Sequence, residues 1–380
     1  MPNSKNIILL IVVAAIVGSI FYLDSLKPKR PELQGSNATS SAISNMTKGE
    51  KSKQYPAAQE LAAIQGYINT PSTSSGQATP ITIGELIGKK VILVDFWTYS
   101  CINCQRTTPY LNSWYEKYRD DGLEIIGVHT PEFEFEKKKE NVEQAVKKYG
   151  IQYPVVQDND YATWNAYRNR YWPRKYLIDI DGFVVYDHIG EGAYEETEEK
   201  IRILLKERAN ILGTNKTIVQ NITQPINATA VDPNQPRSPE IYFGSARNLS
   251  LGNGKSEVSG TQTLEEPTEV NTNTLYMKGE WNFQSENAES KTANSKIIFR
   301  YQGKDLYFVG SSDNGVKVKI LRDGKRLTNE AGEDVEKDES TVMIKEDRLY
   351  KIIQDASYGE HTLEMIIEEP GLRAFTFTFG

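Results

Sequence analysis

The spacing and the setting of two cysteines constrain this chain most. Cys101 and Cys104 are the only cysteines in 380 residues, and they lie three positions apart. Residues 91–97, immediately before them, form a nearly continuous apolar run, which is typical of a strand buried on both faces. Apolar and aromatic residues recur at spacings of three and four between 110 and 118, which predicts a helix after the pair. The cysteines are therefore expected where a buried strand passes into a helix, an arrangement that belongs to α/β folds.

This placement favours redox chemistry. Unpaired amide groups and the helix dipole stabilise a thiolate at a helix N-terminus, and the thiolate is the form that attacks a disulfide. We predict Cys101 as the nucleophile and Cys104 as the thiol that resolves the mixed disulfide. Three alternatives remain open: half of a zinc site, an inert disulfide, and two buried free thiols. The chain has only three histidines, so no metal is predicted, and the expected cofactor is none beyond the Cys101–Cys104 disulfide itself.

The hydrophobic periodicity divides the chain into segments. Alternating strand and helix patterns over residues 55–212, with Asp181-Gly182 as a hairpin signal, predict a central mixed sheet flanked by helices. They include a strand over residues 123–129 and a helix over residues 135–149, whose inward side chains are expected to be Val142, Ala145, Val146 and Tyr149. Residues 213–239 have no periodicity and read as a linker. From 240 to 380 the period changes to two, with short strands predicted over residues 297–301, 305–309, 316–321 and 362–367. This second unit is predicted to be an all-β sandwich.

The N-terminal segment points to a membrane. Residues 7–23 carry no charge and, as a helix, would span roughly 26 Å, which is just enough to cross a bilayer. We predict a single transmembrane anchor over residues 1–24, with a cleaved signal peptide as the alternative. The Ser/Thr/Asn/Lys-rich residues 25–54 are predicted to be a disordered tether.

The first folded unit resembles the thioredoxin superfamily. Asp95 matches the buried acid of the thioredoxin strand, Cys101 and Cys104 match the active pair, Pro109 matches the proline of the active-site helix, and Pro173 matches the cis-proline that faces the site. The sequences of residues 95–104 and 127–133, together with Trp172-Pro173, resemble the TlpA/DipZ-type extracytoplasmic branch. The resemblance covers about residues 60–210. Residues 240–380 resemble, more loosely, the carbohydrate-binding-module-like domain of the DipZ group.

The resemblance implies roles for further residues. A cis Pro173 would leave the carbonyl and amide groups of Trp172 free to pair with substrate. Asp95 is expected to relay a proton to or from Cys104, because a buried carboxyl with a raised pKa suits that task; its alternative is an acid at a strand end that backbone or water satisfies. Trp97 is expected to flank the active-site turn as a second substrate-binding residue, with core packing as its alternative. DipZ-type proteins carry an electron-conducting membrane domain. With a single span expected here, a separate membrane protein of the CcdA/DsbD kind would supply the electrons.

These inferences lead to one prediction and two alternatives. We predict a membrane-tethered thiol-disulfide oxidoreductase, extracytoplasmic and acting as a reductant on disulfides of exported proteins. The alternatives are an envelope glycan-binding protein with an auxiliary redox domain, and a thiol peroxidase. Envelope carbohydrate is accordingly a further expected partner. Six aromatic residues of the β unit either stack on sugar or pack in the core: Tyr242, Tyr276, Trp281, Tyr301, Tyr307 and Tyr358. Nucleic acid is not expected, because the net charge is −7 and phosphate binding needs clustered Lys and Arg.

Overall fold

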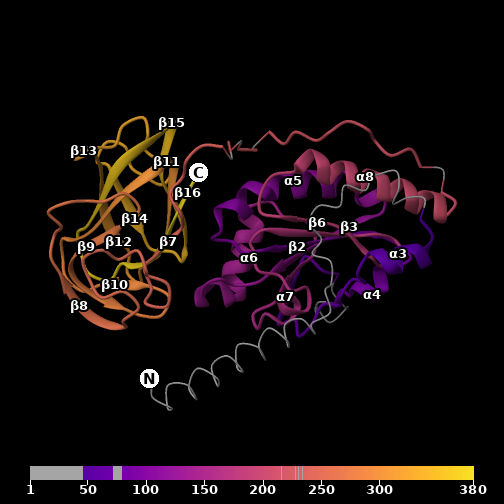
Figure 1. Ribbon diagram of the computed structural model, residues 1–380, viewed down its shortest axis with the longest axis horizontal. Coiled ribbons are helices and arrows are strands. Elements are labelled where there is room, and N and C mark those ends of the chain that lie inside the picture. The colour runs from indigo at the N-terminus through magenta and orange to yellow at the C-terminus, as the bar shows by residue number, and fades with distance from the viewer. Residues whose placement is uncertain (1–45, 72–78, 215, 227, 230, 233) are drawn as a thin grey trace, which may run out of the picture. The chain divides into compact units, whose positions relative to one another are not determined.

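The computed structural model describes residues 46–71, 79–214, 216–226, 228–229, 231–232 and 234–380 (Figure 1). The predicted anchor over residues 1–24 and most of the predicted tether lie outside these ranges. Among the helices that the structure describes, none combines the length and the apolar character that crossing a bilayer requires.

A six-stranded mixed sheet organises the N-terminal half of the described chain. Its strand order is β1-β4-β3-β2-β5-β6. The central strands β2, β3 and β4 are parallel, whereas β5 and β6 form an antiparallel hairpin and β1 pairs antiparallel with β4. The strands are β1 Gly66–Ile68, β2 Val91–Trp97, β3 Leu123–His129, β4 Val155–Gln157, β5 Arg174–Ile178 and β6 Val184–Ile189. All residues of β2 are buried, as its continuous apolar sequence predicts, and the predicted mixed sheet is confirmed.

Helices cover this sheet. Figure 1 shows α5 and α8 running along the same side of it. The elements are α4 Ile83–Leu86, α5 Ile102–Tyr118, α6 Lys139–Lys148, α7 Ala162–Ala166 and α8 Tyr194–Ile211, with the short 3-10 turns η1 Arg119–Asp121 and η2 Glu134–Lys137. Of the four side chains predicted to face inward from α6, Val142, Ala145 and Val146 are buried, whereas Tyr149, at its C-terminal end, is half-buried.

The predicted disordered tether over residues 25–54 is wrong at its C-terminal end. The structure places a helix, α3 Lys48–Gln54, there. Thr47 and Glu50 form a capping box that satisfies free amide groups of the first turn. The side chain of Lys51 is fully buried and ion-paired, which fixes the helix to the rest of the domain. The composition of this segment suggested disorder because composition contains no information about the capping box or the Lys51 ion pair.

The C-terminal half is rich in strands, as predicted. The strands are β7 Ile241–Tyr242, β8 Gly260–Leu264, β9 Leu275–Phe283, β10 Ala288–Ser290, β11 Ser295–Ser311, β12 Val316–Arg322, β13 Lys325–Arg326, β14 Thr341–Ile344, β15 Arg348–Ile367 and β16 Arg373–Phe379. They form one hydrogen-bonded network, in which the long strands β11 and β15 pair along most of their length. Their inward side chains build an apolar core that includes Trp281, Phe299 and Phe377.

Candidate active site

The two cysteines lie at the start of α5, directly after β2. Cys101 is the N-cap residue of the helix, and its Sγ accepts a hydrogen bond from the Cys104 amide at 3.3 Å. Cys101 is half-buried, whereas Cys104 is only 2% exposed, and both are free thiols. Burial, together with the neighbouring Cys101, raises the pKa of the Cys104 thiol well above its usual value. Cys101 is thus the more accessible of the two thiols, and Cys104 holds its proton strongly.

The Trp172–Pro173 segment lies against the same thiol. The Trp172–Pro173 peptide bond is cis, and the Cys101 thiol lies 3.8 Å from the Trp172 carbonyl oxygen. The Trp172 indole N–H donates to the Thr130 carbonyl at 3.0 Å, and its ring packs on Trp164 with 4.3 Å between ring centroids. The structure therefore brings together three of the predicted site residues, Cys101, Trp172 and Pro173.

A buried acid and a buried base lie close to Cys104. Asp95, in β2, is 2% exposed, and its Oδ1 atom has no hydrogen-bond partner among the described residues. Its Cα partner across the sheet is Lys175 of β5, which is 1% exposed and donates to the Gly190 carbonyl. Burial raises the pKa of Asp95 to about 7, although Lys175 opposes the rise, and burial lowers the pKa of Lys175 to about 8. Such a carboxyl can take up or release a proton near neutral pH.

Three other residues near the site, Trp97, His129 and Arg106, are packed, buried or ion-paired. Trp97 is 2% exposed and meets the His129 ring edge-to-face, so its position favours packing over substrate contact. His129 is fully buried, and this burial lowers its pKa to about 3, which keeps it neutral. Arg106, five residues after Cys101, is paired with Glu191, with 2.8 Å between Nε and Oε2.

Sequence reasoning missed Lys175. Its position two residues after Pro173 carries no motif, and only the antiparallel register of β2 and β5 places it opposite Asp95. A buried strand residue that is charged, within the run Lys175-Tyr176-Leu177-Ile178, is the one signal that the sequence offers.

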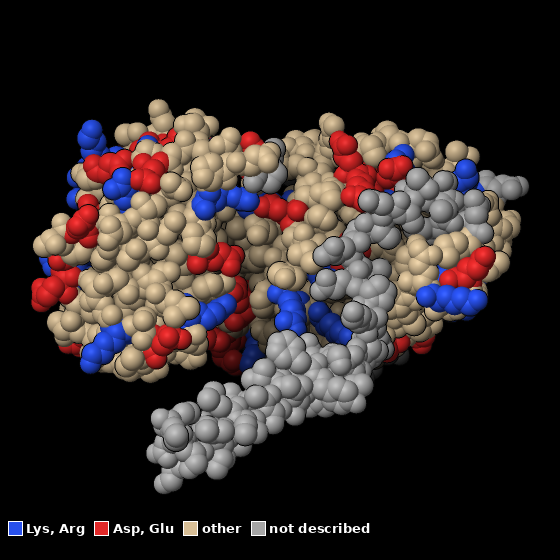
Figure 2. All heavy atoms as spheres, in the orientation of Figure 1, with Lys and Arg blue, Asp and Glu red and all other residues tan. Residues whose placement is uncertain are grey.

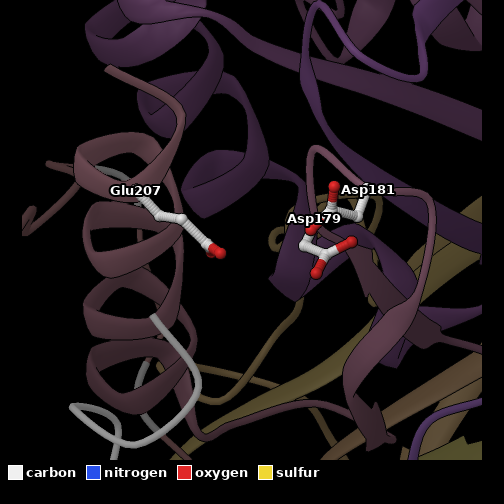
Figure 3. A group of neighbouring side chains, drawn as sticks. All are labelled: Asp179, Asp181 and Glu207. Carbon is white, nitrogen blue, oxygen red and sulfur yellow. The ribbon is translucent and has the colours of Figure 1, made fainter. Parts of the chain in front are cut away.

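Three carboxylates far from the cysteines form a second charged cluster. Figure 3 shows Asp179 and Asp181 from the loop after β5 on one side and Glu207 from α8 on the other. The ammonium group of Lys51 lies 2.8, 3.0 and 2.5 Å from oxygens of Asp179, Asp181 and Glu207. Since this ammonium group already lies within ion-pair distance of all three carboxylates, the cluster is explained as a structural ion-pair site and gives no reason to propose a metal.

The β-rich region offers few aromatic side chains for stacking on a sugar. Of the six aromatic residues that the sequence suggests for this role, four are 6% exposed or less: Tyr276, Trp281, Tyr301 and Tyr307. Their burial favours a core role. On the face drawn in Figure 2, Lys and Arg of the described residues are interspersed with Asp and Glu, so that face has no continuous basic area.

Comparison with known families agrees with this geometry. Residues 68–187 match the AhpC/TSA family, and residues 238–380 match the family described as thioredoxin like C-terminal domain. The chain therefore carries a thioredoxin-like domain of the AhpC/TSA family, as the fold and the cysteine pair suggested.

Individual relatives extend this assignment. Over 347 residues the chain is 36% identical to Protein DipZ of Mycobacterium bovis, a match that covers 90% of this chain and 46% of that protein. The chain thus spans about half the length of the curated relatives it matches first. It is also similar to two proteins named thiol-disulfide oxidoreductases. ResA of Bacillus thuringiensis is 36% identical over 31% of this chain and 65% of that protein. YkuV of Bacillus subtilis is 29% identical over 33% of this chain and 85% of that protein. A solved thioredoxin-like protein in the oxidised form aligns with 26% identity and a TM-score of 0.36, over 40% of this chain and 97% of that chain. Over nine-tenths of its own length, the chain is therefore similar to DipZ.

Proposed function

We propose that this protein is a thiol-disulfide oxidoreductase that reduces disulfides of exported proteins through Cys101 and Cys104. The observation that carries the proposal is the position of the Cys101 sulfur at the N-cap of α5, half-buried and accepting the Cys104 amide at 3.3 Å. A thiolate there is stabilised by a hydrogen bond and by the helix N-terminus while it stays within reach of a substrate. The similarity to proteins named thiol-disulfide oxidoreductases supports the same reaction.

The reaction proceeds in two exchanges. The Cys101 thiolate attacks one sulfur of the substrate disulfide, the substrate S–S bond breaks, and a mixed disulfide forms as the first substrate thiolate leaves. Cys104 then loses its proton and attacks the Cys101 sulfur, which releases the second substrate thiolate. The substrate gains two electrons, and the protein ends with a Cys101–Cys104 disulfide.

Asp95 is the proposed proton acceptor for Cys104. The Cys104 thiol holds its proton strongly because it is buried, so its attack needs a nearby base. Asp95 is a buried carboxyl whose pKa is raised to about 7, and one of its oxygens has no hydrogen-bond partner among the described residues. A group with these properties can receive the thiol proton and later return it to solvent or to the leaving thiolate.

The proposed setting is the outer side of the cytoplasmic membrane. The uncharged residues 7–23 support an N-terminal anchor. A reductant in this setting needs electrons from inside, for which a membrane protein of the CcdA/DsbD kind is the proposed donor. The β-rich region, whose strands enclose an apolar core, is proposed to hold the thioredoxin-like domain near its clients, with envelope carbohydrate as its proposed ligand.

Insulin reduction tests the proposed reaction. The full chain, supplied with dithiothreitol, should reduce insulin faster than dithiothreitol alone, and Cys101→Ser should abolish this gain. When Cys104→Ser is reduced beforehand and freed of dithiothreitol, it should instead accumulate a mixed disulfide with insulin, because the attacking thiol is present and no resolving thiol remains. Each variant thus serves as the control for the other, because both replace a site cysteine by serine. Equal behaviour of the two variants would contradict the assigned roles.

A further inference from the structure

The loop over residues 130–137, between β3 and α6, contacts both halves of the proposed site. At its start, the Thr130 carbonyl accepts the indole N–H of Trp172 at 3.0 Å. Near its end, the Glu136 carboxylate accepts hydrogen bonds from Ser100, the residue directly before Cys101. The loop therefore links the turn that carries the nucleophile to the turn that precedes Pro173.

Glu136 makes the contacts at the cysteine side. Its side chain is fully buried, and Oε1 accepts from the Ser100 amide at 3.2 Å and from the Ser100 hydroxyl at 2.7 Å. Its other oxygen, Oε2, accepts from the amides of Glu132 and Phe133 at 2.6 and 3.0 Å. Four donors thus replace water around this carboxylate, two on the cysteine turn and two on its own loop. Hydrogen bonds to a charged acceptor are stronger and more directional than neutral ones.

The other end of the loop is held by residues 158–161, the segment that leads into α7. The Thr130 hydroxyl donates to Asp158 at 3.3 Å, and the Tyr161 hydroxyl donates to the Pro131 carbonyl. Asp158 also accepts the Trp164 amide at 2.8 Å, and the Trp164 ring packs against Trp172. The Trp172 indole is therefore held both by the loop and by α7. On the cysteine side, the loop is joined to the Ser100–Cys101 turn through the side chain of Glu136.

We propose that Glu136 is a positioning residue, which holds the Ser100–Cys101 turn at a fixed distance from the Trp172 carbonyl. This inference rests on the proposed function, in which a protein disulfide must reach the Cys101 sulfur and the Trp172 backbone together. The two groups are 3.8 Å apart. A small disulfide needs only the sulfur, so its reaction should depend little on this spacing. A protein disulfide needs both groups, and misplacement by a fraction of an ångström is costly in such reactions.

The test compares Glu136→Gln with Glu134→Gln in the full chain. A glutamine side chain has the same shape but one acceptor oxygen, so it can serve only one of the two pairs of donors. Glu134 lies in the same loop with its side chain 72% exposed and serves as the matched control. The rates of reduction of insulin and of hydroxyethyl disulfide are measured for each variant, and the melting temperature is recorded. For Glu136→Gln, insulin reduction should fall about tenfold and hydroxyethyl disulfide reduction less than about twofold. Glu134→Gln should leave both rates unchanged.

Two results would overturn the inference. An unchanged insulin rate in folded Glu136→Gln would show that the contact has no positioning role. An equal fall with both disulfides would show a general effect on thiol reactivity. If Glu136→Gln does not fold, Ser100→Ala decides instead, because it removes one donor to the same carboxylate. Ser100→Ala should slow insulin reduction about threefold without slowing the small disulfide, and no selective loss would overturn the inference. Failure of the wild-type chain to reduce insulin would instead refute the proposed function.

Discussion

The Asp95→Asn substitution should stabilise the reduced protein, and increasingly so as the pH rises. Burial raises the pKa of Asp95 from 3.8 to about 7, so the folded protein holds a proton that the unfolded chain releases. The contribution of this group to stability is therefore complete below pH 3.8 and is lost as the pH rises through about 7. The full difference between the two pKa values corresponds to about 4 kcal/mol.

The measured gain should be smaller than this limit. Lys175 faces Asp95 across the sheet and loses an attracting charge in the variant. We expect Asp95→Asn to be more stable than the wild type by about 1 kcal/mol at pH 4.5 and by about 3 kcal/mol at pH 8.5. The asparagine has nearly the same volume, so no cavity contributes to the difference.

Urea unfolding of both proteins, with the cysteines kept reduced, measures this gain. Asp120→Asn is the matched control, because Asp120 is an exposed aspartate of the same domain. Its stability relative to the wild type should not vary between the two pH values. A variant Asp95→Asn that is no more stable than the wild type at pH 8.5 would refute the reasoning that ties Asp95 to a costly buried charge.

Three further predictions concern the scaffold. Lys51→Met should lower the free energy of unfolding by about 3–5 kcal/mol, because it leaves buried carboxylates without their cation. Lys53→Met, on the exposed side of the same helix, should change it little, and thermal unfolding of the two variants distinguishes these outcomes. Thr47→Ala should cost about 1 kcal/mol through loss of the helix cap, and a loss below the error of a urea titration would count against a stable α3. Gly332→Ala should destabilise the β-rich region, because an added Cβ would meet the Lys351 backbone. Gly49→Ala, with open space around that position, is the control, and equal urea midpoints for the two variants would contradict this packing.

The elements best predicted from the sequence are those whose signal is local. Strands β2 and β3 were predicted with the bounds that the structure has, because a run of apolar residues fully specifies a strand buried on both faces. The helix predicted over residues 135–149 instead begins at Lys139 as α6, after the short turn η2. The reason is Glu136, whose side chain turns inward to accept backbone amides and interrupts the helix.

Features that depend on distant partners could not be predicted. Lys51 finds its partners 130 and 156 positions away, so its burial leaves no local trace. Two short strands were predicted over residues 297–301 and 305–309, where the structure has the single strand β11 with a register shift between Gly303 and Asp305. In the site, the cysteine pair and Pro173 stand out in the sequence, whereas the pairing of Asp95 with Lys175 and the contact of Glu136 with Ser100 arise only from the fold.

The redox potential of the Cys101–Cys104 pair tests the central proposal most directly. The full chain is equilibrated in thiol–disulfide buffers of known ratio, and the free thiols are trapped by alkylation and counted. A reductant of exported proteins should have a potential near about −270 mV, as thioredoxin has. A potential near about −120 mV would assign the protein to the oxidants that introduce disulfides. A pair that does not cycle across this range would contradict the proposed reaction altogether.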